Sequence, residues 1–226
     1  MKTVALIPVK HESERVKQKN FRPFHENKSL LDIKINQLKK ANIFDEIYIS
    51  SDSPDAKKSS ELHDVKFIQR DISLCNNITP WSDVIFEVVN SIPESNDAHI
   101  AWSHTTSPLF NLFNDCLERY FLNLDAGTHN GLVAVSSCKE FILDEMATPV
   151  NYSWGPWHKY SQYLKKYYFV SGALFVSSKE EMLKNRYVIS SNPYLFKATA
   201  EESVDIDTEF DFKFAQYLIN QKNNKN

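Results

Sequence analysis

A short apolar run near the start of the chain constrains its fold more than any other segment. Residues 3–9 read TVALIPV, with an apolar side chain at every position after the first. A strand that is apolar on both faces is typical of a parallel sheet covered by helices on either side. Residues 10–28 are polar and irregularly spaced, so we expect a loop at the carboxyl end of this first strand.

Strand patterns and helix patterns alternate along the rest of the chain. Apolar runs predict further strands over residues 46–51, 65–68, 98–102, 132–135, 168–176 and 203–207. Apolar residues at helical spacing predict helices after residues 29, 79 and 208, and over residues 114–124 and 180–183. The alternation predicts one domain over residues 1–226 with an α/β fold, a three-layer α/β/α sandwich with a mostly parallel sheet.

Capping signals mark three of the predicted helix starts. Ser29 can cap a helix with Asp32 as its capping-box partner, and Thr208 can do so with Asp211. Thr79, which is followed by a proline, predicts an N-cap with proline at the first helical position. These three helices therefore have starts that the sequence itself indicates.

Composition excludes several classes of function. The 26 Lys and Arg against 29 Asp and Glu give a net charge of -3, whereas general nucleic-acid binders are usually basic. All 4 glycines lie at or beyond Gly127, so no glycine-rich phosphate loop follows the first strand. The 3 cysteines are far apart and odd in number, which favours a reducing compartment over a disulfide framework.

Hydropathy predicts a protein of the cytoplasm. No apolar run approaches the roughly 20 residues that a membrane-spanning helix needs. The apolar run at the N-terminus is too short for a signal peptide and soon meets charged residues. We therefore expect neither a membrane nor a nucleic acid as a partner.

Three segments lie where ligands bind in open α/β sheets, beyond the carboxyl ends of strands. The first is residues 10–20, and its cations are Lys10, Arg15, Lys17 and Lys19. Together they could neutralise a polyanion such as a triphosphate, with Ser13 adding a hydrogen bond. A loop whose lysines simply face the solvent explains the same charge, because most charge runs are only surface.

The second segment carries two carboxylates, on Asp205 and Asp207. On a strand the two would point to the same face, and Mg²⁺ in proteins prefers one or two carboxylates together with substrate phosphates. The alternative is that the pair only caps the helix that follows.

The third segment, residues 104–108, offers the imidazole of His104 and three hydroxyls to a polar ligand. The alternative is a plain turn in which Ser107 and Pro108 begin the next helix, with His104 as a structural histidine. No other histidine pairs with a second ligand at metal-binding spacing, and no G-x-S-x-G elbow of a serine hydrolase is present.

Six motifs occur in a characteristic order. In chain order they are Ile7-Pro8-Val9-Lys10 with Ser13 and Lys19-Asn20; Ser50-Ser51-Asp52; Arg70-Asp71 with Leu74-Cys75-Asn76-Asn77; His104-Thr105-Thr106-Ser107-Pro108-Leu109-Phe110; Ser171-Gly172-Ala173; and Asp205-Ile206-Asp207-Thr208-Glu209-Phe210-Asp211-Phe212. In this order they resemble the CMP-sialic acid synthetase family, the acylneuraminate cytidylyltransferases. The likeness covers about residues 4–218, and its most specific parts are the closing motif and the Thr-Ser-Pro-Leu stretch.

The resemblance implies a fold of the nucleotide-diphospho-sugar transferase (Rossmann-like) type and a Mg²⁺-dependent reaction. An acidic 2-keto-3-deoxy sugar would attack CTP, giving a CMP-sugar for surface polysaccharide synthesis and releasing pyrophosphate. It implies catalytic roles for Lys10, Lys19 and Asp207, with Asp205 and Asp207 as metal ligands. The implied nucleotide site comprises Lys10, Ser13, Arg15, Lys19, Asn20, Arg70, Cys75 and Thr79. The implied acceptor site comprises His104, Thr106, Ser107, Ser171 and Gly172.

The resemblance also implies a homodimer in which each subunit lends a protruding arm to its neighbour's site. Residues 146–166 are aromatic, polar and aperiodic, and we expect the arm there. Three competing interpretations remain: a GT-A-type glycosyltransferase that uses the same aspartate pair, a non-catalytic nucleotide-binding relative, and a nucleotidyltransferase for another base.

Several residues depart from the family pattern. Lys10 and Phe110 stand in place of arginine, His104 in place of glutamine, and Ser171 in place of asparagine. A lysine keeps the charge of an arginine but loses its bidentate geometry. Because the changes lie around the phosphate loop and the acceptor pocket, we expect an acceptor other than ordinary N-acetylneuraminic acid. Candidates are a pseudaminic, legionaminic or Kdo-like acid, or a phosphonate.

Overall fold

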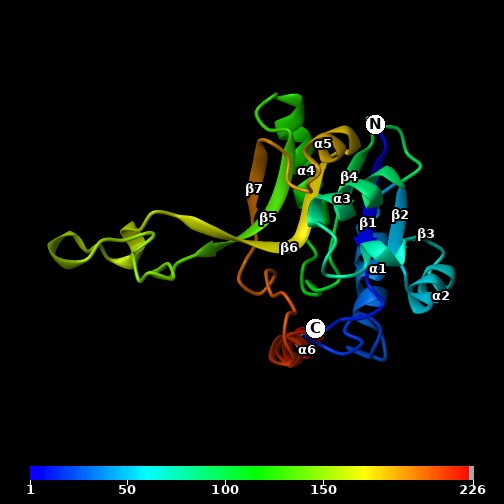
Figure 1. Ribbon diagram of the computed structural model, residues 1–226, viewed down its shortest axis with the longest axis horizontal. Coiled ribbons are helices and arrows are strands. Elements are labelled where there is room, and N and C mark those ends of the chain that lie inside the picture. Colours follow the sequence, from blue (N-terminus) through cyan, green and yellow to red (C-terminus); the bar gives the residue numbers. More distant parts are fainter. Residues whose placement is uncertain (224–226) are drawn as a thin grey trace.

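The computed structural model describes residues 1–223 and is built around one seven-stranded sheet with the order β3-β2-β1-β4-β6-β5-β7 (Figure 1). The strands are β1 (Thr3–Pro8), β2 (Glu46–Ser51), β3 (Lys66–Gln69), β4 (His99–Trp102), β5 (Gly131–Cys138), β6 (Tyr167–Ser178) and β7 (Pro193–Lys197). Strand β6 runs antiparallel to both of its neighbours, and all other neighbouring pairs are parallel. The expected mostly parallel sheet is therefore confirmed.

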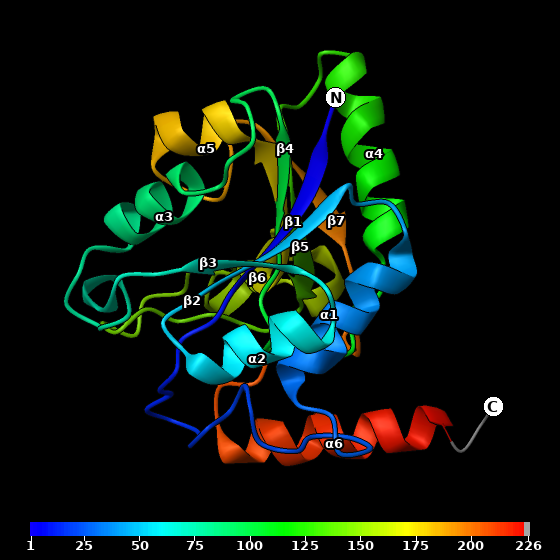
Figure 2. The ribbon, with the colours of Figure 1, turned by 90° about the vertical axis from the view of Figure 1, so that its right-hand side faces the viewer.

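Helices cover both faces of the sheet, which confirms the three-layer sandwich (Figure 2). The helices are α1 (Leu30–Ala41), α2 (Pro54–Leu62), α3 (Trp81–Asn90), α4 (Phe113–Asp125), α5 (Lys179–Asn185) and α6 (Glu209–Asn223), with single 3₁₀ turns η1 (Ile72–Leu74), η2 (Gly155–Trp157) and η3 (Ser161–Tyr163). Helices α1, α2 and α4 pack into the core on one face of the sheet. Helices α3 and α5 pack into the core on the other face.

Strand β1 lies at the centre of this packing. Ala5 and Ile7 belong to the core on the α1 side, and Val4 and Leu6 to the core on the α3 side. All four side chains are fully buried, as the apolar run predicts. Successive residues of a strand point to opposite faces, so each core receives every second side chain of β1.

Two of the three predicted helix starts are confirmed. Ser29 and Asp32 form the reciprocal capping box of α1. At α6, the backbone N–H of Asp211 donates to the Thr208 hydroxyl (3.2 Å), and the Thr208 N–H donates to the Asp211 carboxylate (2.8 Å). The third start is wrong, because the Thr79 hydroxyl donates to the Ser73 carbonyl (2.6 Å) and leaves α3 without a side-chain cap.

The predicted strand over residues 203–207 is also wrong. The last strand is β7, and residues 204–207 form an irregular segment between it and α6. Ile206 does not enter the sheet; it is fully buried in a third cluster with Val16, Leu30 and Phe212. That cluster joins α6 to the loop after β1 and to α1.

A long arm projects from the body between β5 and β6 (Figure 1). The expected arm residues, 146–166, lie within it. Its aromatic rings partly pack on one another, with the Phe141 centroid 4.9 Å from Tyr152 and 5.1 Å from His158. No helix among residues 1–223 is both long and apolar enough to cross a membrane.

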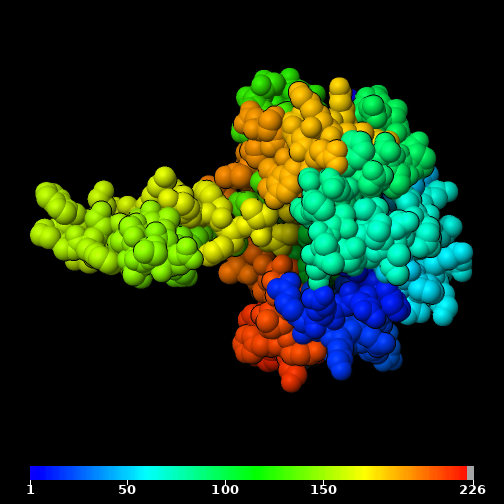
Figure 3. All heavy atoms as spheres, viewed as in Figure 1, coloured from blue at the N-terminus to red at the C-terminus, as the bar shows by residue number. Residues whose placement is uncertain are grey.

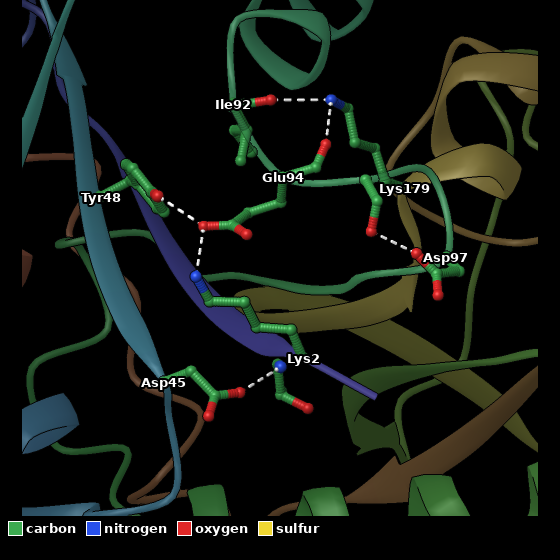
Figure 4. Close-up of polar contacts among 9 residues, drawn as sticks. Lys2, Asp45, Tyr48, Ile92, Glu94, Asp97 and Lys179 are labelled. Carbon is green, nitrogen blue, oxygen red and sulfur yellow. Dashed lines mark hydrogen bonds and ion pairs between the residues drawn. The ribbon is translucent and has the colours of Figure 1, made fainter.

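A polar cluster closes the edge of the sheet where β1 and β4 begin (Figure 4). The Glu94 carboxylate accepts hydrogen bonds from the Lys2 ammonium (2.8 Å) and from the Tyr48 hydroxyl (2.7 Å). The Lys179 ammonium donates to the backbone carbonyls of Ile92 (2.7 Å) and Glu94 (2.9 Å). These bonds tie β1, β2 and α5 to the α3–β4 loop, so this edge is built for stability and the opposite edge is left for a ligand.

Replacing Asp32 with asparagine should destabilise the protein by about 1 to 2 kcal/mol at neutral pH, because the α1 capping box is lost. Burial alone would raise the pKa of Asp32, but hydrogen bonds from Ser29, Ser59 and His63 outweigh it and lower that pKa below 3.8. The Asp32 contribution is thus present above pH 3.8 and lost as the pH falls through the lowered pKa. Urea denaturation from pH 7 downward measures it.

The matched control is Asp115→Asn, in the first turn of α4. Since no capping bond is made there, its effect should stay within about 0.5 kcal/mol. Equal effects of the two substitutions would contradict the assignment of the capping box as the source of stability.

Candidate active site

A cleft of about 990 Å³ opens at the carboxyl edge of the parallel strands. Figure 3 shows the hollow between the blue N-terminal loop, the teal segment before α3 and the base of the arm. Of the predicted site residues, those on its wall are Lys10, Ser13, Arg15, Lys19, Asn20, Cys75, His104, Thr106, Asp205 and Asp207. Segments from both ends of the chain thus meet on one cavity.

Lys19 joins the two ends directly. Its ammonium donates a 2.7 Å hydrogen bond to the backbone carbonyl of Ile206, between the two aspartates of the doublet. Burial lowers the pKa of Lys19, while the carboxylates of Asp205 and Asp207 act in the opposite direction. The structure therefore holds a cation and two carboxylates side by side at the base of the cleft.

The two aspartates differ in their surroundings. Burial raises the pKa of Asp205, against the effects of the Thr106 hydroxyl bond and the Lys19 charge. Asp207 is half exposed and pairs with Arg15 at 2.6 Å. Because Thr208 and Asp211 cap α6, the Asp207 side chain is not needed as the helix cap.

The doublet fits a divalent cation that binds substrate phosphates at the same time. Residues 1–223 contain no group of three or more His, Cys, Asp or Glu that would enclose a metal by themselves. Two carboxylates facing an open cleft are what Mg²⁺ needs when phosphates and water complete its six ligands. Asp205 and Asp207 are the side chains that would hold it.

Lys10 bridges two loops over the cleft. Its ammonium donates to the Asn77 side-chain oxygen (2.7 Å) and to the Asn76 carbonyl (3.4 Å). The Asn77 amide in turn donates to Glu14. Lys17, the fourth cation of the loop, is exposed and does not line the cleft.

Asn20 fixes the floor of the cleft. It is buried, accepts a 2.7 Å hydrogen bond from the Thr105 hydroxyl and donates to the Lys10 carbonyl at 3.4 Å. The loops after β1 and β4 are therefore held together beneath the ligand space.

Five predicted site residues do not line the cleft: Arg70, Thr79, Ser107, Ser171 and Gly172. The buried Arg70 guanidinium donates to the carbonyls of Val9 and Ser50, where β1 and β2 end. The Ser107 hydroxyl donates to the Ser171 carbonyl (3.1 Å) and the Ser171 hydroxyl to the Ala134 carbonyl (3.2 Å). The structure thus gives Arg70, Ser107 and Ser171 positioning roles.

Several residues of the wall are not among the predicted site residues. They include His11, Glu14 and Asp52. The carboxylate of Asp52 accepts from the backbone N–H of His11 at 2.9 Å, which joins the loops after β1 and β2. The signal for Asp52 was present, because it follows a predicted strand directly.

A second missed group is Lys34, a fully buried lysine on α1 beneath the site. Its ammonium donates to the Ser107 carbonyl at 3.0 Å and lies 5.2 Å from the Phe113 ring centroid. Burial lowers its pKa to about 7, although the charge of Asp205 opposes the shift. Helical spacing places residue 34 beside the apolar positions, and only the fold shows that it is enclosed.

Comparison with known proteins finds a family model and relatives that are named cytidylyltransferases. The cytidylyltransferase family model matches residues 4–224. An N-acylneuraminate cytidylyltransferase of Streptococcus agalactiae serotype III is 24% identical over 243 residues, which cover 100% of this chain and 56% of that protein. The chain therefore spans about half the length of this relative. A pseudaminic acid cytidylyltransferase of Campylobacter jejuni is 24% identical over 227 residues, 96% of each chain.

Solved structures share the fold. A CMP:2-keto-3-deoxy-manno-octonic acid synthetase complexed with CTP superposes with a TM-score of 0.67 at 12% identity, covering 98% of this chain and 100% of that one. A 4-diphosphocytidyl-2C-methyl-D-erythritol synthase from Anaerococcus prevotii gives 0.65 at 13% identity, covering 97% and 99%.

Replacing Lys34 with methionine should stabilise the protein by about 1 to 4 kcal/mol near pH 7, because a buried charge gives way to a well-packed apolar chain. The folded pKa of about 7 lies below the ordinary 10.5, so wild-type stability rises with pH between these values. The gain from the substitution should therefore shrink toward pH 10. Denaturation curves at pH 7, 8.5 and 10 measure it.

The control is Lys40→Met on the exposed side of the same helix, which should leave the pH dependence unchanged. If Lys34→Met follows the wild type in parallel from pH 7 to pH 10, Lys34 does not titrate in this range.

Proposed function

Because the chain belongs to the cytidylyltransferase family, we propose that it transfers CMP from CTP to an acidic 2-keto-3-deoxy sugar with the release of pyrophosphate. The observation that carries the proposal is the joining of Lys19 to the Asp205–Asp207 doublet on the wall of one cleft. A cation beside a carboxylate pair suits a nucleoside triphosphate that arrives with Mg²⁺.

Transfer of a nucleotidyl group is mainly a matter of positioning and of charge stabilisation. Lys10, Arg15 and Lys19 would hold the triphosphate, and Ser13 would donate to it. Asp205 and Asp207 would hold Mg²⁺, which when bound would supply charge neutralisation for the phosphates. The hydroxyl oxygen bonds to the α-phosphorus, the bond from this phosphorus to the pyrophosphate oxygen breaks, and the hydroxyl proton is released.

We assign the acceptor to the part of the cleft that His104 and Thr106 line. The relatives are named for N-acylneuraminate, pseudaminic acid and 2-keto-3-deoxy-manno-octonic acid. We propose an acid of this class, other than ordinary N-acetylneuraminic acid, as the acceptor. The protein would act in the cytoplasm. Its CMP-sugar would serve the synthesis of a surface polysaccharide.

The arm suggests a homodimer. Its most exposed aromatic side chains are Trp154, Trp157, Tyr160 and Tyr163, and Trp157 is 78% exposed. Exposed apolar groups gathered on one projection are typical of an interaction surface. A second copy of the chain offers the same surface, so a two-fold symmetric contact can cover both arms.

Asp207→Asn should lower the rate of pyrophosphate release from CTP, Mg²⁺ and a keto-acid sugar by roughly 100-fold or more, since a metal ligand is lost. The acceptors tested are N-acetylneuraminic, pseudaminic, legionaminic and Kdo-type acids. Asp125→Asn, at the exposed end of α4, is the control and should keep the wild-type rate.

Unchanged turnover in Asp207→Asn would contradict the role of the doublet. Preference for UTP, or binding of UDP-sugars in place of CTP, would contradict the assignment to cytidylyl transfer and favour another nucleotidyltransferase or a glycosyltransferase.

The double substitution Trp157→Ser and Tyr160→Ser should convert the protein to a monomer in light scattering, because the apolar contact of the arms is removed. Tyr217→Ser, an exposed aromatic on α6, is the control and should leave the dimer intact. A wild-type protein that is monomeric and fully active would contradict the proposed dimer.

A further inference from the structure

The side chain of His104 accepts a hydrogen bond from a tryptophan. The indole N–H of the fully buried Trp102 donates a 2.8 Å hydrogen bond to Nε2 of His104. An indole nitrogen can only donate, so Nε2 must be the unprotonated, accepting nitrogen of the ring. A neutral His104 therefore carries its proton on Nδ1.

The opposite nitrogen of the ring lies close to a glycine. A Cβ atom at position 172 would lie 3.0 Å from Nδ1 of His104, and the three atoms nearest to it would all belong to this ring. Gly172 has a φ of +68°, a conformation that side-chain-bearing residues rarely adopt. Nδ1 makes no hydrogen bond within the part of the chain that the structure describes, and the ring lines the cleft.

The charged groups around the ring oppose its protonation. Burial, together with the charges of Lys34 on α1 and Lys19 on the loop after β1, lowers the pKa of His104 to about 4. Its other neighbours are aromatic, with the Trp102 and Phe175 ring centroids 6.3 and 6.0 Å away. A proton on Nε2 would also break the bond from Trp102. The ring is thus neutral over the ordinary pH range.

From this geometry we propose that His104 selects the acid acceptor through a single fixed donor, Nδ1–H, which requires a hydrogen-bond-accepting oxygen of the sugar acid where His104 lines the cleft. The inference rests on the proposed function and narrows its substrate. A carboxamide at this position offers both a donor and an acceptor, whereas the anchored imidazole offers only the donor. A carboxylate or acyl carbonyl oxygen meets this requirement, and an amine does not. Trp102 is the positioning residue.

The first test reads the tautomer without any turnover. In the full-length protein labelled with ¹⁵N-histidine, the His104 signals are those that vanish in His104→Gln. We expect a protonated Nδ1 and an unprotonated Nε2 at pH 7, unchanged down to pH 5.5. Trp102→Phe should give a mixture of tautomers, whereas Trp81→Phe, whose ring packs edge-on against Trp102, should leave the signals unchanged.

The second test separates binding of the acceptor from binding of CTP. His104→Leu, which has no donor, should raise the KM for the keto-acid sugar by roughly 10- to 100-fold and leave the KM for CTP within about twofold. His104→Gln restores a donor and should recover most of the loss. In Trp102→Phe, the KM for the acceptor should also rise, because the proton is no longer fixed on Nδ1. Thermal unfolding verifies that each variant is folded.

An Nε2-protonated ring in the wild type, or an unchanged acceptor KM in His104→Leu, would overturn this inference while cytidylyl transfer stands. If the wild type releases no pyrophosphate with any sugar acid of the panel, the proposed function falls and this inference falls with it. The ¹⁵N result would then report only on the anchoring of the ring.

Discussion

The hydrogen bond from the Lys19 ammonium to the Ile206 carbonyl is the contact on which the rest of the site depends. A buried ammonium is costly unless it is hydrogen-bonded or paired, so the loop after β1 must close on the segment before α6. The same segment places Ile206 among Val16, Leu30 and Phe212, which fastens α6 to the loop. Apolar packing and one charged contact thus bring the two ends of the sequence to one cleft.

The cations of the cleft are held mostly by uncharged oxygen atoms. Lys10 donates to Asn77 and to a backbone carbonyl, and Lys19 donates to a backbone carbonyl. Arg15, on the exposed rim, pairs directly with the Asp207 carboxylate. A carbonyl orients an ammonium without cancelling its charge, so Lys10 and Lys19 keep their charge toward the cleft, whose wall also carries the carboxylates of Glu12, Glu14, Asp52, Asp205 and Asp207.

Local patterns in the sequence predicted the parts of the fold that local forces determine. The apolar run of β1 and the capping boxes at Ser29 and Thr208 follow from burial and from backbone donors near these residues. One error lies where long-range packing decides, and the other lies in the local geometry of a loop. Residues 203–207 alternate like a strand, yet Ile206 is drawn into the α6 cluster, and Thr79 bonds to Ser73 instead of capping α3.

The candidate site shows the same division. The rule that ligands bind at the carboxyl ends of strands located the cleft and most of its wall. It could not tell wall residues from those behind the wall, because Arg70 follows β3 as directly as Asp52 follows β2, and Ser107 lies in the same loop after β4 as Thr105. Burial of these side chains by neighbouring loops is a property of the assembled fold, and so is the enclosure of Lys34.

His104 stands where the resembled family pattern has a glutamine, and several elements of the fold support its imidazole. Two nearby lysines disfavour a positive charge on the imidazole of His104. The hydrogen bond from Trp102 on β4 also favours the neutral ring. Gly172 on β6 leaves space for the ring, at the point where the pairing of β5 and β6 shifts its register. In the proposed reaction, Lys19 at the cleft wall would supply positive charge for an acid acceptor, and His104 would add direction and selectivity.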